Sequence, residues 1–558
     1  MDNDLRFNVA DRRPEFSGEI PAEPFNQNQI LEFNHRHHTA MGNYDLVLGG
    51  ARILKLSDYN NHRSNLGSLR NRQLRESVIL ASGLSAMAVG LSGRASLAGV
   101  PKEKITSQLK NEKKRANDRT SAQIMAEVLH NTANTLPTGE EVLIASTITE
   151  GVRVKPGKEI GGNPTIAVGA LYGKKEHRSR YGLPMNTDVS LLSMGTDVID
   201  GTTKSVMGGH SSFTALFLTE SGVKRHLPDI YVQRWMGGAY FDEFNPRDLD
   251  LLDAAEIIAR SYGRSSAKGM SAFFLERNRH HLAMDTLNGA GVVIPYDTDG
   301  DLFPSLILGY DRVNFPGGGT FDSMIGEIGG SAEWAVGVLP LVWRGGQAIG
   351  MLTSQSALTR PDLSPEQKWN ERFHFNEEEF IMMQDARFEQ KPYFSIRDIM
   401  EDPFAGGIAT FGGITDNYYL PFMNGVEINE AANTITVNVL VIYSMGTMEI
   451  WEMTFECQPG VARTRELMAS PKEKLTATAN GDLEKTIKSF MDNDWLRRRF
   501  RLFFNNEYYP ALIPVRDKMV LLHNAIEALI GRGALNERDR DIIEITQKMA
   551  SHWFVENH

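Results

Sequence analysis

The stretch Asp197-Val198-Ile199-Asp200-Gly201-Thr202 carries the strongest chemical signal in the sequence. Its two aspartates and its threonine offer several oxygen atoms on one short segment, and hard divalent cations prefer oxygen ligands. The glycine lets the main chain approach a ligand closely. Metal ions held there could polarise a phosphate ester and lower the pKa of a bound water. Taken alone, the six residues are equally consistent with an ordinary β-turn, because Asp-Gly turns are common.

Three polar segments follow this stretch along the chain: Arg277-Asn278-Arg279-His280, Asp297-Thr298-Asp299-Gly300-Asp301 and Gly329-Gly330-Ser331-Ala332-Glu333. Two arginines with one residue between them can grip a phosphate, and the aspartates can accept hydrogen bonds from sugar hydroxyls. Each segment also has a plain structural interpretation: surface charge, a loop, and a first helical turn favoured by the helix dipole. Their occurrence in this order favours a single site.

Composition excludes several classes of protein. A chain of 558 residues, 41% hydrophobic and 23% charged, predicts a globular protein of two to four domains, or one two-lobed unit with additional arms. The net charge of −11 argues against a protein that wraps nucleic acid. The single cysteine, Cys457, excludes an intramolecular disulfide and a Cys-rich zinc site. A reducing compartment, the cytoplasm, is therefore expected.

Membrane attachment is not expected either. Residues Met1 to Pro21 contain no apolar central stretch of the kind that a secretory signal has. The longest uncharged run, Ser77 to Gly93, is slightly too short for a bilayer span and is diluted by Ser, Gly and Ala. A buried helix, whose small residues let its neighbours approach closely, is the better interpretation.

Helical and β-rich segments alternate between Arg72 and Phe455, which predicts an α/β or a layered α+β architecture. The Ser364-Pro365-Glu366-Gln367 capping box predicts a helix that runs through Phe380 and beyond. Residues Tyr44 to Leu56 predict a short strand or helix at the end of an N-terminal arm. The expected strands are Glu141 to Ala145, Thr165 to Ala170, Phe213 to Leu218, Ala272 to Leu275 and Gly291 to Ile294.

After Pro459 the pattern becomes helical, which predicts an all-helical C-terminal region. Its basic run, Leu496 to Arg501, could contact RNA or an acidic partner, although a solvated helix face is the commoner explanation. The sequence lacks a P-loop, a Gly-x-Gly-x-x-Gly motif, a Gly-x-Ser-x-Gly elbow and a His-Glu-x-x-His motif. The absence of these motifs argues against P-loop nucleotide hydrolysis, nicotinamide chemistry of the usual kind and serine hydrolysis as the function of the protein.

The order and spacing of the polar motifs resemble the class II fructose-1,6-bisphosphatases, which are lithium-sensitive, metal-dependent sugar phosphatases, from about Arg72 to Phe455. Asp197 to Met207 is similar to the family's Asp-Pro-Ile-Glu-Gly-Thr metal motif, with Asp200 in place of its Glu. Leu227-Pro228-Asp229-Ile230-Tyr231 is similar to Ala-Pro-Asp-Met-Tyr. The resemblance implies a layered α-β-α-β-α sugar phosphatase fold with an added C-terminal all-helical region. The expected division is an arm over residues 1–70, a metal-binding lobe over 71–270, a substrate-binding lobe over 271–458 and a helical extension over 459–558.

The resemblance also extends to the other motifs. Residues 277–280 fall where the family has Lys-Pro-Arg-His, 299–301 match its Asp-Gly-Asp, 330–333 resemble Gly-Ala-Pro-Glu and 114–118 match Lys-Asn-Thr-Ala-Asp. Phe411 to Asp416 is similar to an Ala-Thr-Gly-Ile-Thr segment that supports the fold. The implied catalytic residues are Lys114, Asp118, Glu150 and Thr202; the implied metal ligands for Mg²⁺ or Mn²⁺ are Asp118, Asp197, Asp200 and Glu333; the implied substrate-binding residues are Gly201, Thr202, Tyr231, Arg277, Arg279, Asp299, Asp301 and Gly330.

One segment departs from the family pattern. Where the family has Ile-Gly-Glu-Gly-Glu-Ile-Asp, this chain has Ile144-Ala145-Ser146-Thr147-Ile148-Thr149-Glu150, so Ser146 stands in place of a metal-binding Glu. A two-metal cluster carries about four positive charges and needs carboxylates to hold it. Three outcomes stay open: Glu150 replaces the missing ligand, the site works with fewer metals, or hydrolysis has been lost.

The function that the resemblance implies is hydrolysis of a sugar phosphate monoester of the fructose 1,6-bisphosphate or sedoheptulose 1,7-bisphosphate type, in carbohydrate metabolism such as gluconeogenesis. The alternative is a catalytically silent protein that binds or assembles around a sugar phosphate on the same fold. The expected partners are a small-molecule sugar phosphate and further copies of the chain in a homo-oligomer, with no nucleic acid and no membrane.

Overall fold

The structure is a computed structural model, and it describes residues 18–21, 44–57, 60–149, 165–166, 169–178, 189–225, 227–228, 230–310, 321–328, 332–417, 419–420, 423–429 and 431–459. The expected C-terminal helices lie outside these residues, as do Glu150 and Gly330.

The larger of two sheets runs in the order β1-β2-β16-β15-β13-β6-β5-β3-β4, with β14 beside β15. Strands β3 and β5 are parallel, and the other pairs are antiparallel. The bounds are β1 Gly18–Pro21, β2 Tyr44–Ser57, β3 Val142–Thr149, β4 Leu171–Tyr172, β5 Ser190–Asp200, β6 Phe213–Thr219, β13 Gly407–Gly413, β14 Glu427–Asn429, β15 Thr434–Tyr443 and β16 Met448–Pro459.

The smaller sheet runs in the order β12-β11-β7-β10-β8-β9, with β8 parallel to both of its neighbours. Its strands are β7 Tyr231–Gly237, β8 Ala272–Leu275, β9 Tyr296–Asp297, β10 Ser323–Ile328, β11 Gln347–Thr353 and β12 Tyr393–Ser395. Strand β7 comes from residues 71–270, whereas β13, β15 and β16 of the larger sheet come mostly from residues 271–458. Neither sheet is therefore built from one continuous part of the chain.

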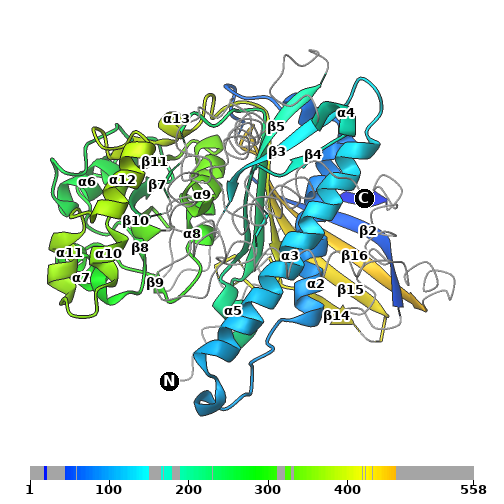
Figure 1. Cartoon of the computed structure of the whole chain (residues 1–558), viewed down its shortest axis with the longest axis horizontal. Helices are drawn as coiled ribbons and strands as arrows, with labels where there is room; N and C mark the ends of the chain where they lie inside the picture. The colour runs from blue at the N-terminus through cyan, green and yellow to red at the C-terminus, as the bar shows by residue number, and fades with distance from the viewer. Residues whose placement is uncertain are drawn as a thin grey trace, which may run out of the picture.

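The helices cover both sheets and fill the space between them (Figure 1). They are α2 Arg72–Ser92, α3 Ser107–Thr135, α4 Lys175–Arg178, α5 Thr202–Met207, α6 Leu251–Ser261, α7 His281–Gly289, α8 Leu302–Leu306, α9 Ala332–Trp343, α10 Gln355–Thr359, α11 Pro365–Glu371, α12 Glu377–Asp385 and α13 Ile396–Ile399, with 3₁₀ helices η2 Gly67–Arg70, η3 Lys102–Lys104 and η4 Asn278–His280.

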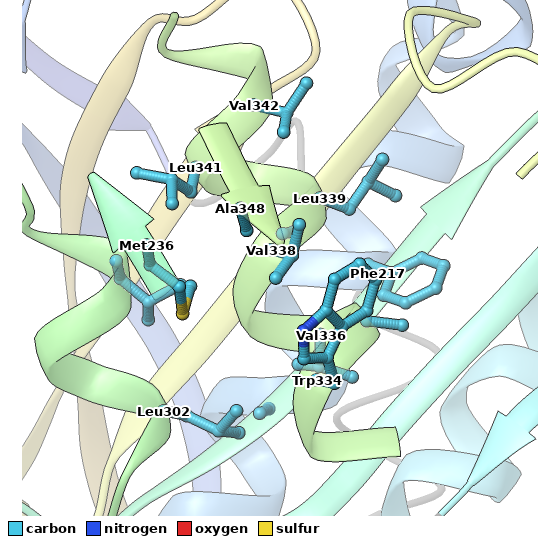
Figure 2. Close-up of a cluster of buried hydrophobic side chains, with 14 of the residues drawn as sticks. Phe217, Met236, Leu302, Trp334, Val336, Val338, Leu339, Leu341, Val342 and Ala348 are labelled. Carbon is cyan, nitrogen blue, oxygen red and sulfur yellow. The ribbon is translucent and has the colours of Figure 1, made fainter. Parts of the chain in front are cut away.

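Apolar side chains form three large clusters in the described part of the chain. In the first, α2 and α3 pack on one face of the larger sheet. In the second, α8 and α9 pack between the two sheets, and Figure 2 shows Trp334, Val338 and Leu339 of α9 there with Phe217 and Met236. In the third, α6 and α7 pack on the smaller sheet. Helices and strands packed in this way confirm the α/β class.

Helix α2 contains the uncharged run Ser77 to Gly93 apart from its last residue. Its stretch from Arg72 to Leu91 is long and apolar enough to cross a membrane, and 89% of an apolar 18-residue segment within it is buried inside the protein. A Cβ atom added at Gly83 would lie 2.2 Å from Met453 Cε, so the glycine allows the helix to approach the sheet closely. The expectation of a buried helix with closely packed small residues is confirmed.

Several element predictions need correction. The helix that begins after Ser364 ends at Glu371, because Asn376 caps a second helix, α12, with a capping box of its own. Of the expected strand 165–170, the described residues lie in no strand. In the segment 291–294, Val293 forms only an isolated bridge with Ser271. The segment Tyr44 to Leu56 lies in β2, which is a long strand of 14 residues rather than a short element.

Candidate functional site

Asp197 and Asp200 lie at the end of β5, where the strand is bulged. Asp197 is paired with Ala215 and Asp200 with Phe213, so three steps along β5 oppose two along β6. Side chains alternate between the two faces of a regular strand, and a bulge of one residue restores the same face to residues three apart. Ala215 and Phe213 both belong to the apolar cluster between the sheets. The bulge therefore turns both aspartates toward the space between the sheets.

The turn after Asp200 is held by the main chain. Gly201 has a φ of +70° and forms the N-cap of α5. A residue with a side chain would be strained in this left-handed conformation. The Thr202 hydroxyl donates a hydrogen bond to the Ile199 carbonyl oxygen at 3.0 Å. Its oxygen lone pairs remain able to accept a hydrogen bond from a water or a substrate.

The Asp-Gly-Asp loop meets this turn directly. Asp200 Oδ1 accepts a hydrogen bond from the Asp301 amide, and Asp200 Oδ2 accepts one from the Leu302 amide, both at 3.3 Å. The Thr203 amide donates to Asp299 Oδ2 at 3.1 Å. Two of the segments singled out in the sequence are thus joined in space.

Burial gives these carboxyl groups unusual electrostatics. Burial raises the pKa of Asp200 well above its usual value, and the charges of Asp301 and Asp299 raise it further. The Lys204 ammonium and the Asp301 amide act in the opposite direction. Burial likewise raises the pKa of Asp301. A concentration of buried acids of this kind is stabilised by cations.

One such cation is Arg234, a fully buried residue of β7 that the sequence analysis missed. Its Nη1 donates to the Asp301 carbonyl oxygen at 3.3 Å, and its Nη2 lies 3.7 Å from Asp301 Oδ2. Burial lowers the pKa of this guanidinium, whereas nearby carboxylates raise it; these carboxylates are Asp301, Glu333 and Asp200. Glu333 and Asp200 therefore both lie near one buried arginine. An arginine in an otherwise uncharged strand was the available signal, because an arginine is rarely buried without a partner.

The upstream motif also converges on this point through helix α3. Lys114 Nζ donates to Thr203 Oγ1 at 3.3 Å, and Ser121 Oγ donates to the Val198 carbonyl oxygen at 2.7 Å. Residues 114, 118 and 121 share one face of a helix, so Asp118 lies between these two contacts. Asp118 is buried, with 1% of its surface exposed.

The predicted arginine pair has protein partners of its own. Arg277 Nη1 donates to the main-chain oxygens of Glu276, at 2.9 Å, and Thr298, at 2.6 Å. Arg279 forms an ion pair with Glu327 of β10, with Nε 2.5 Å from Oε1, and lies 5.3 Å from the centre of the Tyr231 ring. The sequence analysis missed Glu327, because a single acid at the end of a strand has no local signature.

The carboxylates of the site are suitable ligands for a hard cation, but the structure does not group them closely around one point. Among the described residues, no three His, Cys, Asp or Glu side chains are grouped closely enough to hold a metal ion. Ser146, in β3, is fully buried, and its hydroxyl has no hydrogen-bond partner in the described part of the chain. Glu150 and Gly330, two of the predicted site residues, lie outside the described residues. The predicted metal ligands share the chemistry that Mg²⁺ and Mn²⁺ prefer, and the ligand set stays a prediction.

Comparison with known proteins gives a family and two distant relatives. The model of the family "Bacterial fructose-1,6-bisphosphatase, glpX-encoded" matches residues 182–454. Two curated proteins of Synechococcus sp., from strains JA-3-3Ab and JA-2-3B'a(2-13), are each 22% identical over 203 residues, which are 35% of this chain and 53% of the relative. Both are named D-fructose 1,6-bisphosphatase class 2/sedoheptulose 1,7-bisphosphatase. The chain thus spans about half the length of these relatives. The similarity to this family, first noted from motifs, is confirmed at this distant level.

Proposed function

We propose that the protein is a phosphatase that hydrolyses a phosphate monoester of a sugar. The observation that carries the proposal is the contact between Asp200 and the Asp301 amide, because it brings the oxygen-rich turn of one sheet to the Asp-Gly-Asp loop of the other. The family match over residues 182–454 covers both segments and supports the same activity. Substrates of the fructose 1,6-bisphosphate or sedoheptulose 1,7-bisphosphate type are suggested by the names of the two relatives.

A divalent cation, Mg²⁺ or Mn²⁺, belongs to this proposal. Asp118, Asp197, Asp200 and Glu333 would hold it, and when bound it would supply positive charge to the phosphoryl oxygens. Asp197 and Asp200 belong to β5, and this strand contacts both α3, which carries Asp118, and α9, which carries Glu333. Glu150 is a further candidate for the ligand that Ser146 does not supply.

The chain's own residues would position the reacting groups. In hydrolysis a water oxygen attacks phosphorus as the ester P–O bond breaks, and the departing sugar oxygen receives a proton. The Thr202 hydroxyl, whose proton points to Ile199, can accept a hydrogen bond from that water. Asp118 or Glu150 would take the water's proton. Lys114, held 3.3 Å from Thr203 Oγ1, would add positive charge beside the phosphate.

The remaining expectations belong to the same proposal. The packing of α2 and α3, the larger sheet, α8 and α9, the smaller sheet, and α6 and α7 supports the five-layer sugar phosphatase fold. We also propose a cytoplasmic homo-oligomer that binds neither nucleic acid nor membrane. Tyr231, Arg277 and Gly330 are kept as substrate-binding residues.

A second candidate function, a silent sugar-phosphate binding protein, is favoured by one specific observation. Ser146 occupies the position of a family metal ligand, and its buried hydroxyl has no hydrogen-bond partner among the described residues. A carboxylate that holds a catalytic metal ion is replaced there by a neutral group. Such a protein would bind a sugar phosphate without releasing phosphate.

A panel of phosphorylated metabolites separates the two functions. The full chain is incubated with each metabolite in Mg²⁺, in Mn²⁺ and in EDTA, and released phosphate is measured beside a calorimetric titration. The phosphatase predicts release that depends on metal and stops in EDTA. Binding without release under every metal would favour the silent protein. Neither binding nor release with any sugar phosphate would contradict both functions.

A further inference from the structure

The ion pair between Arg279 and Glu327 occupies the part of the site that was expected to grip a phosphate. Arg279 Nε lies 2.5 Å from Glu327 Oε1, and Nη2 contacts the same oxygen. The carboxylate-bearing side chain is 6% exposed and the arginine side chain 17% exposed. Desolvated ion pairs are screened little by salt, so Glu327 neutralises most of the charge that Arg279 would present to a ligand.

His280, which also lies beside Glu327, does not replace Arg279 as its charged partner. His280 Nδ1 lies 2.7 Å from the Leu275 carbonyl oxygen, and its Nε2 accepts a hydrogen bond from the Glu327 amide at 3.4 Å. Burial lowers the pKa of His280 to about 3, so the imidazole is neutral and adds no positive charge. The charge that faces Arg279 at this point is the Glu327 carboxylate.

The strand register fixes the position of this carboxylate. Glu327 is paired with Gln233 on β7, and Tyr231 lies two residues before Gln233 on that strand. The Arg279 guanidinium lies over the Tyr231 ring at 5.3 Å. Glu327 therefore sits on the same side of the sheet as Tyr231, beside two predicted substrate-binding residues.

A phosphate and a hydroxyl group would meet different surroundings here. A phosphate that approaches Arg279 must share it with the Glu327 carboxylate, and two like charges close together in a partly buried site repel strongly. A sugar hydroxyl can donate to Glu327 and accept from Arg279 without any such repulsion. Arg277 keeps its positive charge, but two of its donor hydrogen bonds are directed to the main-chain oxygens of Glu276 and Thr298, so it offers a phosphate fewer donors than an unpaired arginine would.

We infer that Glu327 sets the substrate class by excluding a second phosphate, so that the site takes a sugar or polyol monophosphate in preference to a bisphosphate. This inference rests on the proposed function of the same site. It differs from what the names of the relatives suggest, since both of those proteins are named for bisphosphates.

The test compares affinities, which a merely structural role of Glu327 would not change selectively. The full chain and its Glu327→Gln variant are titrated calorimetrically with fructose 1,6-bisphosphate, fructose 1-phosphate and fructose 6-phosphate at constant ionic strength. The titrations are run in EDTA and repeated in Mn²⁺ with released phosphate measured in parallel. Glutamine keeps the size of the side chain and can still accept a hydrogen bond from Arg279.

The unaltered chain should bind at least one monophosphate as tightly as the bisphosphate. Glu327→Gln should tighten bisphosphate binding about tenfold and change monophosphate binding less than about twofold. Glu256→Gln is the matched control, because it removes one charge from α6, where Glu256 lies 3.8 Å from Arg260. That control should change none of the three affinities. Glu327→Ala, with its melting temperature recorded, provides a second variant in case glutamine alters the local packing.

The outcomes distinguish the inference from the proposed function. A bisphosphate bound more than about tenfold more tightly than either monophosphate by the unaltered chain would overturn the inference alone, and so would an unchanged ratio in both Glu327 variants. If none of the three compounds binds in either condition, the inference falls, and release measured with any other sugar phosphate would show that the proposed function survives it.

Discussion

Asp200 Oδ1 accepts a hydrogen bond from the main-chain amide of Asp301 at 3.3 Å, across 101 residues of sequence. The first residue ends β5 of the larger sheet, and the second follows β9 of the smaller sheet. The candidate site is therefore made by both sheets together. Its geometry depends on their packing as well as on the acidic residues themselves.

Replacing Asp197 by asparagine tests the role of the two aspartates at the bulged end of β5, Asp197 and Asp200. We expect phosphate release in Mn²⁺ to fall at least about a hundredfold, because a predicted metal ligand loses its charge. We also expect the rise in melting temperature that Mn²⁺ produces in the unaltered chain to disappear. Asp285→Asn, at an exposed residue of α7, is the control and should change neither measurement. Unchanged turnover in Asp197→Asn would remove the proposed mechanism.

Gly201→Ala tests the left-handed turn before α5. Alanine at a φ of +70° should lower the free energy of unfolding by about 1 kcal/mol, and its Cβ would lie 3.2 Å from the Ser211 carbonyl oxygen. Gly263→Ala is the matched control, because Gly263 has a φ of +72° and a Cβ there would meet no described atom within 4 Å. Both variants should lose similar stability in urea. Only Gly201→Ala should also lower the affinity for a sugar phosphate, by about tenfold. Equal affinities in the two variants would show that the turn does not position the ligand.

Ser146→Ala and Ser121→Ala form a pair that reports on the unusual serine of β3. Both side chains are fully buried, and Ser121 Oγ donates to the Val198 carbonyl oxygen at 2.7 Å. Loss of that bond should lower the free energy of unfolding by about 1 kcal/mol. Ser146→Ala should leave it unchanged within about 0.5 kcal/mol, or raise it, because a buried hydroxyl without a partner is removed. A loss in Ser146→Ala as large as in Ser121→Ala would contradict a Ser146 hydroxyl that makes no hydrogen bond.

His280 predicts a specific dependence of stability on pH. Burial lowers its pKa from 6.5 to about 3, so between these values the unfolded chain binds a proton that the folded protein does not. The free energy of unfolding should therefore fall as the pH decreases through this window, by up to about 1.4 kcal/mol per pH unit from this residue. His280→Asn should have a flatter slope in urea titrations between pH 6.5 and 4.5, whereas the half-buried control His281→Asn should keep the slope of the unaltered chain. Parallel slopes in all three proteins would contradict a neutral His280.

The parts of the site that could be predicted are those with a local signature. Asp200 and Asp301 stand in short segments where oxygen-bearing side chains and a glycine occur together, and the structure joins them. Arg234 and Glu327 are single charged residues in strands, and their partners come from distant parts of the chain. No pattern within either strand indicates such a partner, so only the folded chain reveals them.

The same distinction explains the fold predictions. The capping box at Ser364 is local, and the helix begins where it predicts. The predicted end of that helix was wrong, because Asn376 caps a second helix a few residues later. Spacing alone does not show whether one helix continues past Asn376 or a new one begins there. The length of strand β2 was underestimated, because it is set by pairing with β16 at the other end of the described chain.

Glu333 stands in the first turn of α9, and the next residue, Trp334, is fully buried between the two sheets. Trp334, Val338 and Leu339 of this helix pack beside Phe217 and Met236 (Figure 2). Because these residues lie between the two sheets, their bulk helps to set the distance between the polar residues that the two sheets carry. A smaller side chain in place of Trp334 or Leu339 would change the distance between the two sheets without altering any polar group of the site. The size of the molecule that fits the site would then depend on the buried apolar residues of α9 as well as on the polar residues of the site.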